Sequence, residues 1–268
     1  MNDNTIKRAD SIHFSRSFLS IPYIIFLAVF VVLPLLVVLY YAFTNGSGQF
    51  TVRHFVNFFT NDRTVGTLFY SLFVAVIVTL FCLLLAYPTA YILAKSDFKH
   101  KGLLLIILVV PMWINFTLRL TAMKEILDAI EGNLAYYSFF NTILCMTYDF
   151  LPFMILPIYN SLSKLDDSMV EAARDLGASG RQAMFRVIIP MSMPGIVSGI
   201  TMVFLPAMTN YVVLDMVYNS TFIMGSLIGS YFSAYDWHAG SMVSVILLAL
   251  IFVISALENR VTGSNERE

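Results

Sequence analysis

Charged residues are scarce in this chain, and their scarcity excludes several classes of protein. Only 12% of the 268 residues are charged, whereas soluble domains carry about 25%. The formal net charge is −1, so the chain has no basic face for a nucleic acid. Its two cysteines, Cys82 and Cys145, lie in apolar runs. We therefore expect small buried thiols rather than a disulfide or a metal-binding pair.

The sequence also lacks the motifs that hold nucleotides or catalytic metals. It contains no G-x-x-x-x-G-K-[ST] loop, so we expect no ATP site in this chain. It contains no H-E-x-x-H pair, and its four histidines are scattered. We predict no catalytic residue, no metal site and no cofactor of its own, and we interpret the chain as a non-enzymatic subunit.

Long apolar runs are what the chain has instead. Hydrophobic residues make up 58% of it and its mean hydropathy is +0.77. A helix needs about 20 apolar residues to cross a bilayer. Six segments satisfy or nearly satisfy this length: 21–43, 67–93, 103–123, 136–159, 193–218 and 239–257.

The first apolar run follows Lys7, Arg8 and Arg16, as the core of a signal peptide would. It is longer than the usual 7–15 residues of such a core, and no A-x-A-like cleavage site follows it. We therefore predict an all-α integral membrane protein in which residues 20–259 form a six-helix domain. The tails are 1–19 and 260–268.

The distribution of lysine and arginine predicts the orientation. Twelve of these residues fall in the two tails and in the connections after the second and fourth spans. Only four, Arg53, Arg63, Arg119 and Lys124, fall on the opposite side. Since positive charge stays in the cytoplasm, both termini are expected there.

One cytoplasmic segment, residues 168–196, reads SMVEAARDLGASGRQAMFRVIIPMSMPGI. Ser168 with Glu171, and Ser179 with Gln182, have the spacing of two helix-starting capping boxes. Gly177 between them suits the left-handed position that ends a helix. Pro190 and Pro194 mark the entry to the next span. The pattern predicts a short helix, a bend, a second short helix and then the membrane.

The first of these short helices is amphipathic, with Val170, Ala173 and Leu176 on one face. This pattern suits either a helix that rests on lipid or one that docks on a protein. The mixed charge and the small alanines favour a protein partner, because lipid-resting helices usually present a basic face and large anchors.

The run EAARDLGASGRQAMFRVIIP resembles the EAA motif of ABC importer permeases. Glu171, Ala172, Ala173, Gly177, Ile188 and Pro190 fill that pattern. From Pro88 onward, the chain more narrowly resembles the B-type permease subunit of spermidine/putrescine importers. The resemblance implies the type I ABC importer permease fold and a multi-pass location in a bacterial plasma membrane.

The resemblance also implies a set of partners. They are a two-copy ATPase subunit carrying ATP-Mg, a second homologous permease, an extracellular solute-binding protein and the lipid bilayer. The loop 160–192 would couple to the ATPase through Glu171, Ala172, Ala173, Arg174, Gly177 and Pro190. For Glu171, capping of its own helix and pairing with a basic ATPase residue remain equal alternatives.

Ionisable residues at membrane depth are candidates for a transport path. Asp149 lies near the middle of the fourth span and Asp215 late in the fifth. Carboxylates and aromatic faces suit the ammonium groups of a polyamine. Further candidates for this path are Trp113, Asn115, Tyr148, Asn210 and Tyr211. Each also has a structural interpretation, such as helix packing or an aromatic belt, and depth makes Asp149 the strongest candidate.

Two alternatives remain for the function. An ABC permease could carry a different small organic solute or ion, and an ion-coupled secondary transporter could use Asp149 as its proton site. The second leaves the EAA-like segment unexplained.

The external connection after the third span is short for the resembled family. Gly132, Asn133 and Leu134 are interpreted as a remnant of a longer segment. The carboxylates of Glu125, Asp128 and Glu131 make this connection acidic.

Overall fold

A computed structural model describes residues 21–96, 99–217 and 220–265. The predicted amino-terminal tail lies outside these ranges. Within them, every extended regular element is helical, and the β-type pairing is an isolated bridge between Thr44 and Phe50. This agrees with the predicted all-α fold. Among the helices of the described ranges, five are long and apolar enough to cross a membrane, and a bent pair makes a sixth candidate.

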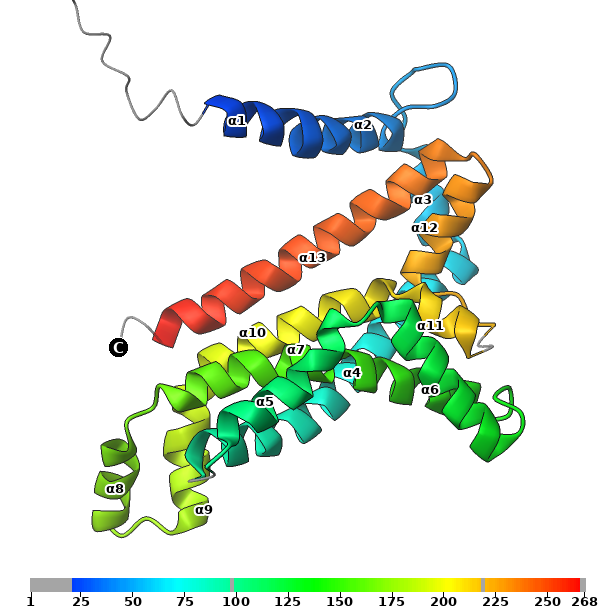
Figure 1. Ribbon diagram of the computed structural model, residues 1–268. Helices are drawn as coiled ribbons and strands as arrows, with labels where there is room; N and C mark the ends of the chain where they lie inside the picture. The colour runs from blue at the N-terminus through cyan, green and yellow to red at the C-terminus, as the bar shows by residue number, and fades with distance from the viewer. Residues whose placement is uncertain (1–20, 97–98, 218–219, 266–268) are drawn as a thin grey trace, which may run out of the picture.

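The first span lies apart from the central bundle (Figure 1). It comprises α1 (Ile21–Leu27), the π-helical η2 (Ala28–Val32) and α2 (Leu33–Ala42). Large apolar side chains along it are exposed, for example Phe30 and Leu36 at 66% and 58%. Such a surface suits lipid rather than water. Its main neighbour is α13 (Trp237–Asn265), which contacts α2.

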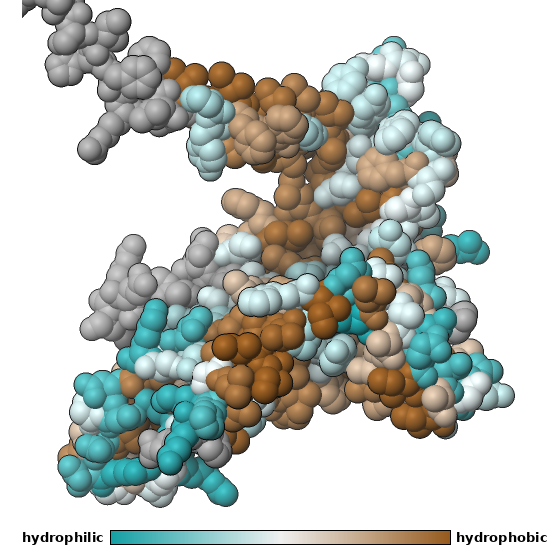
Figure 2. Space-filling model, viewed as in Figure 1, coloured by the Kyte–Doolittle hydropathy of each residue, from teal (hydrophilic) through white to brown (hydrophobic). Residues whose placement is uncertain are grey.

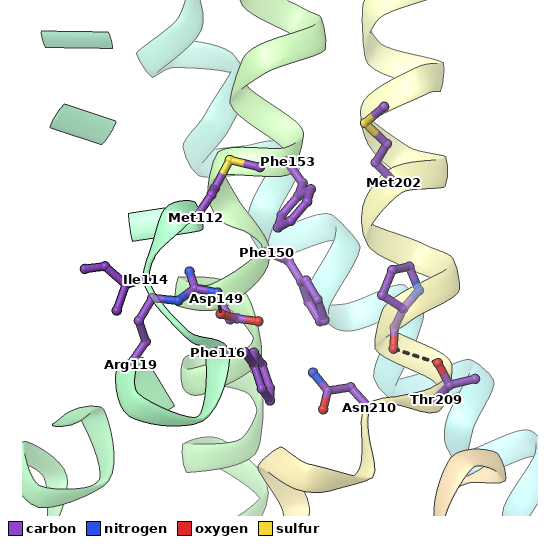
Figure 3. A pocket seen from close by; sticks show the side chains of 11 residues that line it. Met112, Ile114, Phe116, Arg119, Asp149, Phe150, Phe153, Met202, Thr209 and Asn210 are labelled. Carbon is purple, nitrogen blue, oxygen red and sulfur yellow. Dashed lines mark hydrogen bonds and ion pairs between the residues drawn. The ribbon is translucent and has the colours of Figure 1, made fainter. Parts of the chain in front are cut away.

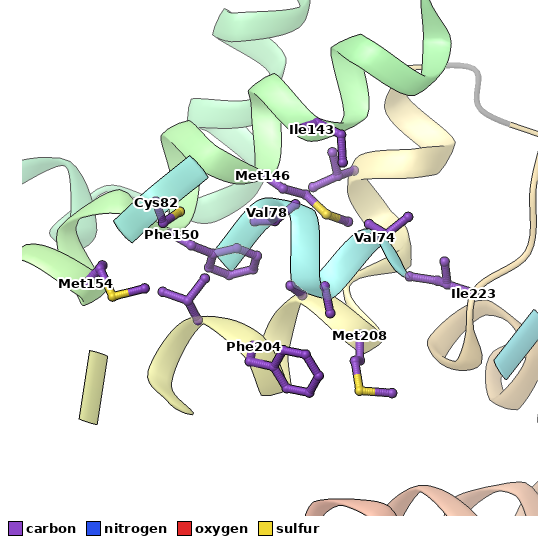
Figure 4. Packing of buried hydrophobic residues seen from close by; sticks show 14 of the residues in the cluster. Val74, Val78, Cys82, Ile143, Met146, Phe150, Met154, Phe204, Met208 and Ile223 are labelled. Atoms are coloured by element: carbon purple, nitrogen blue, oxygen red, sulfur yellow. The ribbon is translucent and has the colours of Figure 1, made fainter. Parts of the chain in front are cut away.

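Three helices form the centre of the molecule: α4 (Asp62–Lys95), α7 (Ser138–Ser163) and α10 (Ile189–Thr209). Their facing sides carry the main hydrophobic core (Figure 4). Val78 and Cys82 come from α4, Met146 and Met154 from α7, and Met208 from α10; all five are fully buried. Cys82 and Cys145 are both free and buried, as expected.

Glycines allow α7 and α10 to approach closely. A Cβ added at Gly195 would lie 2.5 Å from the Cβ of Ser161 and 2.6 Å from the carbonyl oxygen of Pro157. One at Gly199 would lie 2.6 Å from the sulfur of Met154. Small residues four apart are a recurring device at membrane helix crossings, because they bring backbones into contact.

The third span departs from the expected single helix over 103–123. Helix α5 (Lys101–Val109) continues into the 3-10 turn η3 (Val110–Trp113), and α6 (Phe116–Glu131) starts after a break. The two parts meet at an angle of 100°. Pro111 favours a helix boundary, and Asn115 starts α6 by accepting hydrogen bonds from the amides of Thr117 and Leu118.

Helix α6 also replaces much of the external loop that the sequence predicted after the third span. It ends at Gly132, which adopts φ +71°. The chain then returns into the bundle, where Leu134 is buried and Asn141 donates a 2.9 Å hydrogen bond to Glu131.

The remaining helices frame the bundle. Helix α3 (Arg53–Thr60) precedes α4, while α8 (Asp167–Asp175), α9 (Gly180–Ala183) and the π-helical η4 (Met184–Ile188) connect α7 to α10. Helices α11 (Tyr211–Met216) and α12 (Met224–Ser233) lead to α13. Helix α13 runs to Asn265, beyond the predicted end of the sixth span and into the predicted carboxyl tail.

The surface separates into polar ends and an apolar middle (Figure 2). Hydrophilic residues gather over the end that carries α8 and α9, and apolar residues cover the helices beside it. This distribution is that of a bilayer-spanning protein with its connecting segments in water. Two regions of this frame carry the residues singled out from the sequence: the α8–α9 segment and a cavity among α6, α7 and α10.

Candidate functional site: the coupling segment and the α6–α7–α10 cavity

Helix α8 begins at Asp167 and its N-cap is Asp166. It therefore starts earlier in the sequence than expected from Ser168 as the cap. The Asp166 carboxylate accepts a 3.0 Å hydrogen bond from the amide of Ser168. The predicted capping box of Ser168 with Glu171 is therefore wrong, since Ser168 already lies inside the helix. Hydrogen bonds from the Ser168 backbone and side chain hold the pKa of Asp166 below its usual value, with a smaller contribution from the charge of Lys95.

The other local predictions for this segment are confirmed. Gly177 adopts φ +84° and ends the first short helix. The amide of Ala178 donates to the carbonyl of Ala173 at 3.0 Å, and that of Gly177 to Arg174 at 2.8 Å. Ser179 and Gln182 form the predicted capping box. The backbone hydrogen bonds around Gly177 and the cap of α9 therefore fix the angle between α8 and α9.

The second short helix is not separate from the membrane span. Helices α9, η4 and α10 follow one another without a loop from Gly180 to Thr209, over thirty residues. Pro190 directly follows the π-helical turn inside this run, where proline removes a backbone hydrogen bond and helices commonly kink, and Figure 1 shows a change of direction between α9 and α10. The predicted short helix and fifth span thus form one uninterrupted helical segment.

The face that the sequence assigned to a partner is open. Glu171, Ala172 and Arg174 are exposed, and Ala173 is partly buried. Leu176 is 89% exposed, although it is a large apolar residue on a short helix with otherwise few such groups. A single exposed apolar side chain is common on protein surfaces, so the docking role of this face stays a prediction from the EAA-like motif.

Lys95 at the end of α4 ties down the start of α8. Its Nζ donates to the carbonyl of Leu165 at 2.9 Å and contacts the Asp167 carboxylate at 2.5 Å. Lys95 is 17% exposed and Asp167 74%. Sequence reasoning used Lys95 only as a marker of orientation, because nothing local reveals a contact across 72 residues.

The second region is a cavity of about 520 Å³. It lies within the 300–1,000 Å³ range of small-molecule sites. Its lining comes from the break before α6 and from α6, α7 and the end of α10 (Figure 3). Aromatic rings predominate on one side, and the lining residues are Met112, Ile114, Phe116, Arg119, Asp149, Phe150, Phe153, Met202, Pro206, Thr209 and Asn210.

Asp149 stands in the wall of this cavity, near the middle of α7. At 1.5 Å per residue, it lies roughly 17 Å from the start of the helix and roughly 21 Å from its end. Its side chain is only 5% exposed, and its Oδ1 is 2.5 Å from Nη2 of Arg119. Asp149 therefore lies near the middle of the fourth span, as predicted, and it has a counter-ion within the same chain.

Arg119 was placed on the external side of the membrane by the charge count, and this assignment is wrong. Its side chain is 7% exposed and paired with Asp149 inside the protein. The outer side therefore keeps three of its four predicted basic residues, and the asymmetry behind the predicted orientation becomes larger. Sequence reasoning missed the pairing because the break before α6, not the spacing along the chain, brings Arg119 to Asp149.

Five of the other predicted path residues do not line this cavity. Trp113 is 83% exposed, and the Asn115 side chain is used as the cap of α6. Tyr148 and Tyr211 are 39% and 41% exposed, and Asp215 is exposed. Of the residues that the sequence proposed for the path, Asp149 and Asn210 line the cavity. The aromatic lining instead comes from Phe116, Phe150 and Phe153.

Comparison with known proteins identifies the family. A family model described as "Binding-protein-dependent transport system inner membrane component" matches residues 13–262. This chain belongs to that family. The permease is thus a multi-pass membrane transport component rather than an enzyme, and its EAA-like segment and all-helical fold agree with this assignment.

Within this family, the permease is similar to proteins named for polyamine transport. The permease is 36% identical to the spermidine/putrescine transport system permease protein PotB of Haemophilus influenzae, with 86% of this chain and 89% of the relative covered. It is 35% identical to the protein of the same name from Escherichia coli, over 82% of this chain and 88% of the relative.

Solved structures share the fold of the permease. A chain of a bacterial alginate ABC transporter, in complex with an alginate pentasaccharide-bound periplasmic protein, matches with a TM-score of 0.73 at 14% identity. That match covers 91% of this chain and 92% of the other. A chain of the MetNI methionine ABC transporter matches with a TM-score of 0.57 at 20% identity, covering 75% and 94%.

Proposed function

We propose that this chain forms half of the translocation path of an ATP-driven importer of polyamines such as spermidine and putrescine. The cavity is the observation that supports a polyamine as the cargo. One carboxylate, Asp149, lies in its wall near the middle of the fourth span, together with the rings of Phe116, Phe150 and Phe153. A carboxylate attracts an ammonium group, and aromatic faces attract both the cation and the methylenes beside it. The names of the relatives agree with this chemistry.

The proposal includes partners and a direction. An ATPase subunit in two copies holds ATP-Mg and docks on α8 through Glu171, Ala172, Ala173 and Arg174. Gly177 and Pro190 fix the geometry of that docking segment. A second permease completes the path, a binding protein delivers cargo from outside, and both termini lie in the cytoplasm. The exposed face of α8 and the loop-free helical run from α9 into α10 support this arrangement.

The test is uptake of labelled putrescine and spermidine by cells that express the complete transporter and lack other polyamine uptake. Glu171→Lys and Ala172→Leu should abolish uptake, because they reverse the charge or fill the small surface on which the ATPase docks. Glu171→Gln and Ala172→Ser, which keep the shape, serve as matched controls. Unchanged uptake by the two disruptive variants, at equal amounts in the membrane, refutes the coupling assignment.

The same assay decides between the energy sources and the cargoes. Uptake should persist when the proton gradient is collapsed at constant ATP and should stop when ATP hydrolysis is blocked. The opposite result favours an ion-coupled carrier with Asp149 as its proton site. Uptake of another solute but of no polyamine by the wild-type complex refutes the proposed cargo while leaving the transporter class in place.

A further inference from the structure

The ion pair between Arg119 and Asp149 leaves part of the hydrogen-bonding capacity of the guanidinium unused. Arginine can donate five hydrogen bonds and often grips a carboxylate with two of them. Here Nη2 engages Asp149, while Nε and Nη1 are buried and have no partner among the described residues. Buried donors without acceptors are unfavourable. The guanidinium is therefore held at Asp149 by its charge more than by a full set of hydrogen bonds.

The position of the pair creates a conflict with the cavity that surrounds it. Asp149 and three phenylalanine rings make a surface suited to an ammonium group. In this structure, however, the carboxylate already carries a cation, since Arg119 lines the same cavity (Figure 3). A cationic cargo meets a wall of no net charge, and it must compete with the guanidinium for the carboxylate.

We propose that Arg119 is an internal competitor for Asp149, so that the guanidinium and an ammonium group of the cargo occupy the carboxylate in turn. This inference rests on the proposed polyamine cargo. The exchange replaces one ion pair by another, and the buried carboxylate is never left without a counter-charge, which would be strongly unfavourable. Return of Arg119 then displaces the cargo, and a neutral solute has no means of displacing Arg119.

The backbone around Arg119 allows such an exchange. Arg119 lies one turn into α6, just after the 100° break that separates α6 from α5. Its pair with Asp149 ties this end of α6 to α7, and the hydrogen bond from Asn141 to Glu131 ties the far end. Release of the Arg119 pair removes one attachment of α6 to α7 beside the cavity, while the buried side chain of Leu120 and the hydrogen bond at the far end still hold the helix. Cargo binding would thus weaken the attachment of α6 at one defined point.

Kinetics of uptake by the complete transporter test the competition. Arg119→Gln removes the competing charge, so the KM for putrescine should fall at least tenfold, and the maximal rate should also fall because nothing displaces the cargo. Arg119→Lys keeps a competing cation and should retain a KM near that of the wild type. A variant Arg119→Gln with an unchanged KM overturns the proposal.

The double variant Arg119→Gln/Asp149→Asn separates competition from packing. A neutral pair of similar shape can still hold α6 against α7, so it should reach the membrane in normal amounts. It should nevertheless transport poorly, since no carboxylate remains for the cargo. Wild-type uptake and KM in the double variant show that the pair only holds the helices together, and they overturn the proposal.

A measurement on the wild-type protein avoids substitution altogether. Phenylglyoxal modifies accessible arginines, and mass spectrometry can follow Arg119 and the exposed Arg63 in the same sample. Putrescine should accelerate modification of Arg119 by displacing it from Asp149 and should leave Arg63 unchanged. Protection of Arg119, or no change, overturns the competition. If the wild-type complex imports no polyamine at all, the proposed function fails instead, and that result is read from uptake alone.

Discussion

Substitution of Gly195 by alanine should separate α7 from α10. The added Cβ would lie 2.5 Å from the Cβ of Ser161 and 2.6 Å from the carbonyl oxygen of Pro157. Carbon atoms in contact prefer 3.5–4.0 Å, so the helices must move by about 1 Å. One of the two obstacles is backbone and cannot rotate away, as a flexible side chain would.

The magnitude follows from two opposing terms. Overpacking of a tight core costs about 1–3 kcal/mol, and the backbone obstacle places this site near the upper limit. Replacing glycine by alanine inside a helix returns roughly 0.5–1 kcal/mol through the backbone entropy. We expect a net loss of about 2 kcal/mol, which lowers the ratio of folded to unfolded protein by roughly 30-fold.

Gly180 provides the matched control, because it lies at the start of the same continuous helix and a Cβ there meets nothing within 4 Å. Gly180→Ala should be neutral or slightly stabilising. Thermal unfolding of the purified transporter in lipid nanodiscs compares the two. Adding Ser161→Gly to Gly195→Ala should restore only part of the loss, since the Pro157 carbonyl remains. Equal unfolding temperatures for Gly195→Ala and Gly180→Ala would refute the packing argument.

Two further predictions concern the attachment and the start of α8. Lys95→Ala should reduce ATP-dependent uptake severalfold, because it releases the start of α8 from α4. It should change the free energy of unfolding by no more than about 1 kcal/mol, since the partner carboxylate of Asp167 is largely exposed. Lys101→Ala, on an exposed residue, is the control, and wild-type uptake by Lys95→Ala would contradict a role of Lys95 in holding α8. The pKa of Asp166 is lowered in the folded protein, so its carboxylate stabilises α8 above the usual aspartate pKa near 4, and this stabilisation is lost as the pH falls through the lowered pKa. The protection of the α8 amides, measured as the exchange rate relative to the intrinsic rate at each pH, should therefore fall at acidic pH in the wild type. It should not fall in Asp166→Asn, whose amide oxygen caps without titrating. Identical pH dependence of the protection in the two proteins would contradict this assignment.

The sequence was most informative where a local rule decides the structure. Apolar length located the spans, and the left-handed position of Gly177 and the capping box of Ser179 depend on neighbours within a few residues. The start of α8 was misplaced because Asp166 and Ser168 are both good caps. Asp166 occupies the cap in the structure, beside the point at which Lys95 holds the carbonyl of Leu165.

The cavity could not be predicted from the sequence, because residues far apart in the chain form it and no local pattern reveals their contacts. Asp149 could be singled out as a residue near the middle of a span, because a carboxylate in an apolar run is conspicuous by itself. Arg119 was misassigned because the third span was taken as one helix, which would carry residue 119 toward its outer end. The 100° break brings that side chain back to α7 instead. The aromatic lining was missed because phenylalanines in an apolar span have no feature that distinguishes a cavity from a core.

The unbroken helix from Gly180 to Thr209 has a consequence for timing. At 1.5 Å per residue it is about 45 Å long. Its first residues adjoin the proposed docking helix, and its last turns contribute Met202, Pro206 and Thr209 to the cavity wall. No loop separates its two ends, and the π-helical turn before Pro190 is the point at which it can bend. A displacement imposed at the end next to the proposed docking helix would change the shape of the cavity in the same step, so release of the cargo would need no separate signal.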